Sequence, residues 1–145
     1  MMAGTHVFNS SLEAGVRAVS FLDSYYPKSL DFELLMKIDY ILVNSADFDG
    51  PESLHPKTPN RKGELSSRRE TVRAGIELMK RFDLIEIDLT HDGVFYRATE
   101  NANPYLELMR ANYSIAIRNT SEWLVSELNE IGFERLNITL GKRVF

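Results

Sequence analysis

The chain has 145 residues, a net charge of −4, 43% hydrophobic residues and 26% charged residues, which is the composition of one ordinary globular domain. It contains no cysteine, which excludes disulfides, thiolate zinc sites, iron–sulfur clusters and cysteine nucleophiles. Every apolar run is shorter than the ~18 residues that span a bilayer, and the first residues lack the apolar region of a signal peptide. We expect a single domain over residues 1–145 that works in the cytoplasm without a membrane partner.

Two helices are predicted in the first third of the chain. Ser10 begins a capping box, and apolar residues then recur at helical spacing, which indicates a helix over residues 11–24. Either Ser29 or Asp31 can cap a second helix over residues 31–45, where the apolar residues again fall on one stripe.

The composition then changes to prolines and glycines. Residues 46–63 hold Gly50, Pro51, Pro56, Pro59 and Gly63, which predicts a long loop. Loops of this length are usually functional or mobile because most connections are far shorter. A tolerated surface insertion explains the segment equally well.

Basic residues gather around a third predicted helix, from about Glu64 to Asp83. Residues 57–81 hold eight basic and three acidic residues, a net charge of +5 that leaves −9 for the rest of the chain. Guanidinium groups suit phosphates or acidic partners because they pair bidentately with them. A solvated helix face explains the same charges if acidic neighbours on the helix neutralise part of them. The candidate phosphate- or partner-binding residues are Lys57, Arg61, Lys62, Arg68, Arg69 and Arg73.

A hairpin and two more helices are predicted in the remaining chain. The runs LIEIDL and VFYRAT flank Asp92-Gly93, which is a strong hairpin pattern. Thr99 can cap a short helix, and a longer helix is expected from about Tyr113 to Ile131, with Gly132 as its stop. Residues 113–145 then form a C-terminal helical extension and a tail with room for one short strand.

This order of elements predicts a mainly α fold with a small β-hairpin. A basic helix followed directly by a hairpin is the arrangement of a recognition helix and its wing, so we expect a winged-helix-like domain with an added C-terminal helix. A three-helix bundle with an inserted hairpin is the alternative. The expected wing tip contains Asp92 and no lysine or arginine, which argues against ordinary duplex recognition.

Three stretches carry a more specific pattern: FNSSLEAGVRAVSFLDSYYPKSLD, LMKIDYILVNSADFDGPESLHPKTPNRKGELSSRRE and DGVFYRATENANPYLE. In them the chain resembles the middle component 2 family of bacterial ABC three-component systems, over roughly Phe8 to Val125. The most specific part runs from Asp39 to Leu65. The resemblance implies an accessory subunit that assembles with an SMC/Rad50-like ABC ATPase and an effector of the same operon in anti-phage defence, as in Lamassu-type systems.

Two further segments are candidate contact sites. The resemblance makes His55, Pro56 and Glu64 an expected interaction loop. A loop histidine that bonds its own backbone explains His55 better than a metal site does, because no second histidine has ligand spacing with it. Trp123, Leu124 and Leu128 belong to an apolar stripe that is either core or an interface helix for a partner or a second copy.

Catalysis is not expected. The sequence holds no GxxxxGK[ST], GxSxG or HExxH motif, and no nucleophile, base and orienting group converge in it. We therefore expect no enzyme activity, no metal and no cofactor. A DNA-binding transcriptional regulator is the alternative to the accessory subunit, and DNA contact within the complex stays open.

Overall fold

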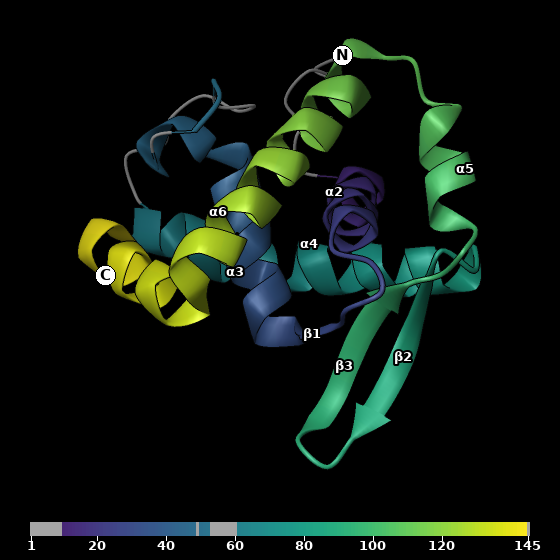
Figure 1. Ribbon diagram of the computed structural model, residues 1–145, viewed down its shortest axis with the longest axis horizontal. Coiled ribbons are helices and arrows are strands. Elements are labelled where there is room, and N and C mark those ends of the chain that lie inside the picture. The colour runs from purple at the N-terminus through teal and green to yellow at the C-terminus, as the bar shows by residue number, and fades with distance from the viewer. Residues whose placement is uncertain (1–9, 49, 53–60, 145) are drawn as a thin grey trace.

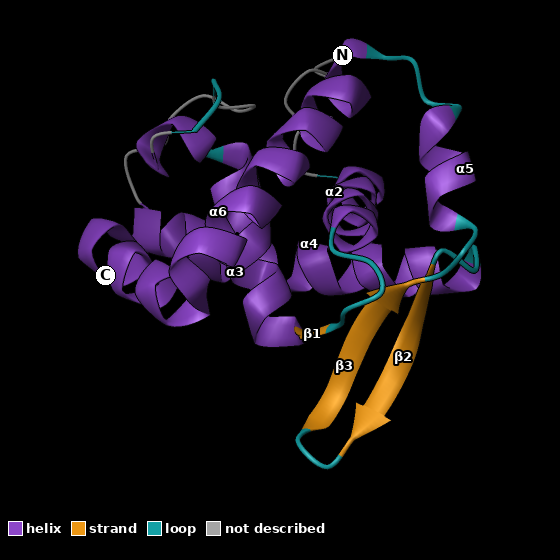
Figure 2. Ribbon diagram, in the orientation of Figure 1, coloured by secondary structure: helices purple, strands orange, loops and turns teal. Residues whose placement is uncertain are grey.

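The computed structural model describes residues 10–48, 50–52 and 61–144. A body of helices carries a two-stranded hairpin that projects from it (Figures 1 and 2). The helices are α2 (Ser11–Ser24), α3 (Phe32–Val43), α4 (Arg61–Arg81), α5 (Ala102–Glu107) and α6 (Asn112–Val144), with a 3-10 turn η1 (Ser45–Phe48). The strands are β1 (Leu30–Asp31), β2 (Ile85–Thr90) and β3 (Gly93–Ala98).

The first two predicted helices are confirmed, together with their caps. The Ser10 hydroxyl accepts a hydrogen bond from the Glu13 backbone N–H at 3.1 Å, and the Asp31 carboxylate accepts one from the Leu34 N–H at 2.9 Å. These acceptors satisfy backbone donors that the first turn of a helix leaves open.

The predicted loop over residues 46–63 needs correction, because both of its described ends are helical. Its first residues belong to η1 and its last residues belong to α4. Arg61 and Lys62 are good helix formers, so the helix starts earlier than its apolar stripe indicates.

The predicted hairpin is also confirmed. Antiparallel pairs run without interruption from Ile85↔Ala98 to Thr90↔Gly93, so His91 and Asp92 form a two-residue turn. Gly93 has a φ of 128°, a conformation that favours glycine. The short strand β1 pairs with β3 and completes a sheet of order β1-β3-β2. The fold is therefore mainly α with a small antiparallel sheet, and its element order is compatible with the winged helix that the sequence predicts.

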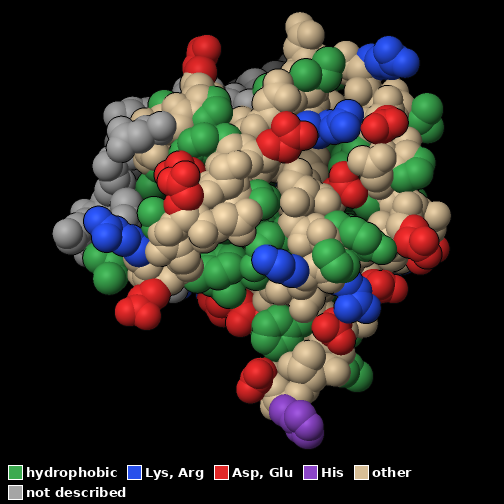
Figure 3. Space-filling model, in the orientation of Figure 1, with side chains coloured by type: hydrophobic (Ala, Val, Ile, Leu, Met, Phe, Trp, Pro, Cys, Tyr) green, Lys and Arg blue, Asp and Glu red, His purple; other side chains and the backbone are tan. Residues whose placement is uncertain are grey.

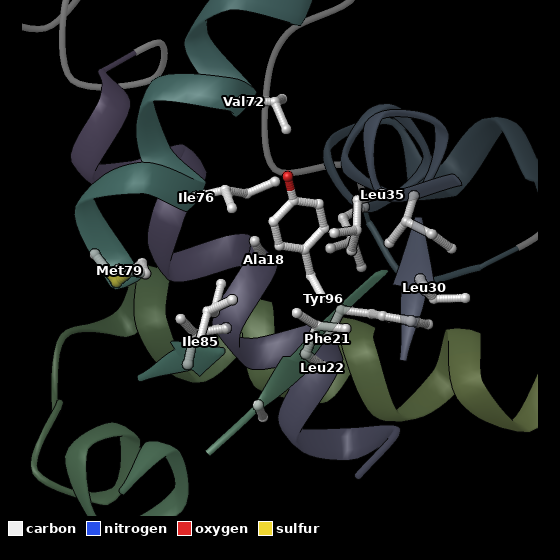
Figure 4. Packing of buried hydrophobic residues seen from close by; sticks show 14 of the residues in the cluster. Ala18, Phe21, Leu22, Leu30, Leu35, Val72, Ile76, Met79, Ile85 and Tyr96 are labelled. Carbon is white, nitrogen blue, oxygen red and sulfur yellow. The ribbon is translucent and has the colours of Figure 1, made fainter. Parts of the chain in front are cut away.

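The base of the hairpin belongs to the core. Tyr96 of β3 lies between Ile76 of α4 and Leu35 of α3, close to the buried side chains of α2 (Figure 4). Ile85 of β2 and Ala98 of β3 are also buried. The sheet thus closes one end of the helical core, and the rest of the hairpin extends beyond it.

Helix α6 is part of this core rather than an extension outside it. Ile117, Leu124 and Leu128 are buried, and α6 packs against α2. The predicted stop at Gly132 is confirmed as a break, with φ 79° and ψ 163°. The strand predicted in the tail is wrong, because the chain returns to helix after the break and stays helical to Val144. Glu134 and Arg135 favour a helix and precede the β-branched residues of the tail.

Helices α2 and α4 cross at two glycines. A Cβ atom at Gly75 would lie 2.5 Å from the backbone nitrogen of Gly15 and 2.7 Å from the carbonyl oxygen of Ser11. Distances this short exclude any side chain, so the two backbones touch directly. The glycines therefore determine how closely α2 can lie on α4.

We expect Gly75→Ala to destabilise the protein. Helix propensity alone would give a gain of about 1 kcal/mol at this position, but overpacking against α2 should cost about 1–3 kcal/mol and leave a net loss or at best no gain. Urea unfolding measures the change in free energy. Ala74→Gly at the exposed neighbouring position gives the local propensity effect for comparison. If Gly75→Ala raised the free energy of unfolding by the full helix-propensity difference, the close contact between α2 and α4 would be contradicted.

Candidate functional site

Four helices meet at a group of polar side chains, which we call the Asp39 cluster: Arg17, Asp39 and Arg68, which are buried, and Tyr113, which is half-buried. The Arg17 Nε of α2 donates to Asp39 Oδ1 of α3 at 2.6 Å, and the Arg68 Nη1 of α4 donates to Asp39 Oδ2 at 3.1 Å. Arg17 Nη1 also donates to the Tyr113 hydroxyl of α6 at 2.9 Å. The side chains of Arg17, Asp39 and Arg68 are 0%, 5% and 6% exposed. One carboxylate therefore joins two guanidinium groups inside the core.

Burial and pairing act in opposite directions in this cluster. Burial alone would lower the pKa of Arg17, but the charge of Asp39 and the hydrogen bonds of Arg17 to Asp39 and Tyr113 outweigh it, so this pKa lies above its usual value. Burial raises the pKa of Tyr113, and the positive charge of Arg17 opposes part of that rise. Arg17 thus stays charged although water does not reach it. Because Arg17 is fully covered, the cluster orders helices and offers no open site for a substrate.

Glu13 lies at the edge of this cluster. Burial raises the pKa of its carboxyl group, and the charge of Arg17 acts against that rise. Its Oε1 atom is buried and has no hydrogen-bond partner among the described residues. The carboxylate of Asp39 therefore contacts two guanidinium groups, whereas the carboxylate of Glu13, beside the cluster, has one buried oxygen without a hydrogen bond.

The position of Arg68 corrects its predicted place on the outer face of the third helix. It points into the core at Asp39, so contact with a phosphate or a partner through Arg68 would require this pair to open. The helical spacing contains the signal: Arg68 precedes Val72 by four residues and therefore falls on the stripe of Val72 and Ile76, which are buried. The charge of Arg68 predicted a surface position, whereas its helical spacing from Val72 predicts a position in the core.

Arg69 and Arg73 lie at the surface and already have partners on α3. Arg69 donates to both carboxylate oxygens of Glu33, at 2.6 and 3.1 Å. The guanidinium groups of Arg73 and Arg69 lie 4.1 and 5.6 Å from the ring centroid of Phe32. The hydrogen bond from Arg69 is the main reason that the pKa of Glu33 lies below its usual range. These two arginines therefore tie α4 to the first turn of α3.

The remaining basic and loop residues cannot be placed. Lys57, His55 and Pro56 lie outside the described residues. The backbone of α4 includes Arg61, Lys62 and Glu64, but their side chains are outside the described part. Their roles in phosphate or partner contact stay predictions.

Two of the three interface-helix residues are core residues. Leu124 and Leu128 are buried in the main hydrophobic cluster because the apolar stripe of α6 faces α2 and α3. Trp123 is half-buried against the same cluster. A Cβ atom at Gly50 would lie 2.5 Å from the Trp123 ring, so the backbone after η1 rests directly on the indole. Of the two alternatives for this stripe, the structure supports the core for Leu124 and Leu128 and leaves Trp123 partly exposed.

One face of the described residues shows mixed charge. Acidic and basic side chains alternate on the face in Figure 3, which has no continuous basic area. Among the described residues, no three histidine, aspartate or glutamate side chains are grouped so that they could hold a metal ion. No helix in that part of the chain combines the length and apolar character needed to cross a membrane.

Comparison with known proteins identifies a family. The model described as "ABC-three component (ABC-3C) system Middle Component 2" matches residues 7–144. This confirms the resemblance in the sequence and extends it past Val125 into the tail. No curated protein and no solved structure matches the chain.

We expect Asp39→Asn to destabilise the protein strongly. The change leaves Arg17 and Arg68 buried without their negative partner, and breaking a buried ion pair in this way costs about 3–5 kcal/mol. Urea unfolding measures the loss. Asp88→Asn is the matched control, because Asp88 pairs with Arg97 at 3.5 Å near the surface, where such pairs contribute about 1 kcal/mol or less. Equal losses in the two variants would contradict the structural role of the Asp39 cluster.

Acid should remove the contribution of the Arg69–Glu33 pair. The folded-state pKa of Glu33 is lowered, so the pair stabilises the protein above the usual glutamate pKa of 4.5 and loses that effect as pH falls through the lowered value. We expect Glu33→Gln to have a lower melting temperature than the wild type at pH 7. The difference in melting temperature should disappear as pH falls below the lowered pKa of Glu33, and it should be smaller in high salt. A gap that is independent of pH and salt would contradict the ionic origin.

Proposed function

The chain belongs to the family of ABC-three component system Middle Component 2, and from this membership we propose that it is a non-catalytic accessory subunit. In this proposal it assembles with an SMC/Rad50-like ABC ATPase and an effector in anti-phage defence. The observation that carries the proposal is a family match over residues 7–144, which includes every residue that the structure describes.

The placement of the polar residues supports the non-catalytic part of this proposal. The Asp39 cluster links four helices, and its charged members Arg17, Asp39 and Arg68 are buried. Its Arg17 cannot reach a substrate because its side chain is fully buried. Catalysis needs a nucleophile or base that meets a substrate in a cleft, and these groups serve the packing of the domain instead.

A DNA-binding regulator is the second candidate. The positive charge of residues 57–81 and a helix α4 directly followed by a hairpin favour it. Three placements weigh against it: Arg68 is buried, Arg69 is paired with Glu33, and the hairpin turn carries Asp92. We therefore rank the accessory subunit first, with DNA contact inside the complex as an open alternative.

Co-expression with the products of the neighbouring genes should yield a complex. We expect the tagged chain to retain the ATPase, the effector or both through affinity purification and size-exclusion chromatography. Co-expression with an ATPase of an unrelated ABC system is the control and should give no complex. A chain that elutes alone, and whose salt-sensitive binding to its own promoter is lost on Arg69→Ala with Arg73→Ala, would establish the regulator instead.

A further inference from the structure

The outer half of the hairpin presents an apolar face beyond the core. Directly paired residues of β2 and β3 lie on the same face of the sheet, which places Ile87 beside Tyr96 and Leu89 beside Val94. At the base, this face is buried through Ile85 and Ala98. Farther out it becomes exposed: Ile87 is 41%, Val94 46% and Leu89 76% exposed. One apolar face thus starts in the core and ends in solvent.

The opposite face of the hairpin already has the features of a solvent-facing surface. Arg97 of β3 donates to Glu86 of β2 at 2.9 Å and lies 3.5 Å from Asp88. The Ser29 hydroxyl donates to Asp88 at 3.4 Å. In a hairpin with one polar and one apolar face, the apolar face normally packs on something. The exposure of Ile87, Leu89 and Val94 is therefore unusual for such a face and suggests that another chain covers it.

An open backbone edge lies beside this face. The sheet order β1-β3-β2 makes β2 an edge strand, and its pairing with β3 continues from Ile85 to Thr90 without a bulge. The strand contains no proline. Natural edge strands are usually protected by bulges, prolines or inward-pointing charges. In the described structure, the N–H and C=O groups on the outer side of β2 are available to a further strand.

Charge indicates which strand fits. The hairpin from Ile85 to Ala98 holds Glu86, Asp88 and Asp92 against Arg97, a net charge of −2. Antiparallel pairing of β2 with β2 of a second copy would place Glu86 and Asp88 close to the same acids of that copy, and like charges across strands are destabilising. A strand from another protein with basic residues on the polar face meets no such repulsion.

We propose that β2, with the apolar face formed by Ile87, Leu89 and Val94, binds an extended segment of a partner subunit. Apolar residues of that segment would continue the apolar face, and lysines or arginines at the alternate positions would lie beside Glu86 and Asp88. Backbone hydrogen bonds supply affinity in this mode of binding, and the alternating side chains supply specificity. This inference rests on the proposed function, because the segment belongs to the ATPase or the effector.

The test uses the full chain co-expressed with the ATPase and effector of the neighbouring genes. We expect Leu89→Lys with Val94→Lys to weaken association at least about ten-fold, as expected for the loss of central apolar contacts. Leu108→Lys is the matched control, because Leu108 is 78% exposed at the end of α5. It should leave the affinity unchanged. Asp92→Lys should weaken association in low salt and less so in high salt.

The outcomes separate the two proposals. A wild-type chain that forms no complex overturns both. A complex that the Leu89 and Val94 changes leave intact overturns only the hairpin inference. A wild-type dimer that these changes convert to a monomer, with partner binding unaltered, assigns the face to a second copy and also overturns it. Circular dichroism and melting temperature check the fold, and Leu89→Ser with Val94→Ser replaces the lysine pair if that pair melts early.

Discussion

The carboxylate of Asp39 is the buried group on which the polar contacts among the helices of this domain depend. Arg17 of α2 donates to both of its oxygens, at 2.6 and 3.5 Å, and Arg68 of α4 donates to Oδ2. Arg17 also donates to the Tyr113 hydroxyl, which connects the carboxylate to α6. Buried ion pairs contribute little net stability compared with apolar packing, but each member is costly to leave alone. The cluster therefore restricts α2, α3, α4 and α6 to arrangements in which all of its groups meet, and the glycine crossing brings α2 and α4 close enough to do so.

The same cluster changes the meaning of the basic charge in the sequence. Residues 57–81 carry +5 as a linear segment, but Arg68 is neutralised inside the core and Arg69 is paired with Glu33. The folded surface therefore offers less positive charge than the segment does. The hairpin, in contrast, keeps both its acidic residues and its exposed apolar residues at the surface. A polyanion-binding domain would present a basic helix. The most distinctive surface of this domain is instead the hairpin, with one polar and one apolar face.

Local signals predicted most of the fold. Ser10, Asp31 and the Asp92-Gly93 turn act through neighbours within a few residues, so caps and hairpin could be found from the sequence. The family could also be identified from its motifs. The Asp39 cluster could not, because Arg17 and Asp39 are 22 residues apart and Arg17 and Tyr113 are 96 apart. Charged residues are expected in solvent unless their distant partners are known, and an apolar stripe such as that of Leu124 does not reveal whether it faces the domain's own core or another protein.

The contact between Gly50 and Trp123 gives the domain an internal optical reporter. Trp123 is the single tryptophan of the chain, and its indole lies against the backbone at Gly50, within the segment that carries the most specific family pattern. Its emission wavelength depends on how much water surrounds the ring. Fluorescence of the unlabelled protein therefore follows the contact between Gly50 and Trp123 of α6, during unfolding and during assembly with other subunits.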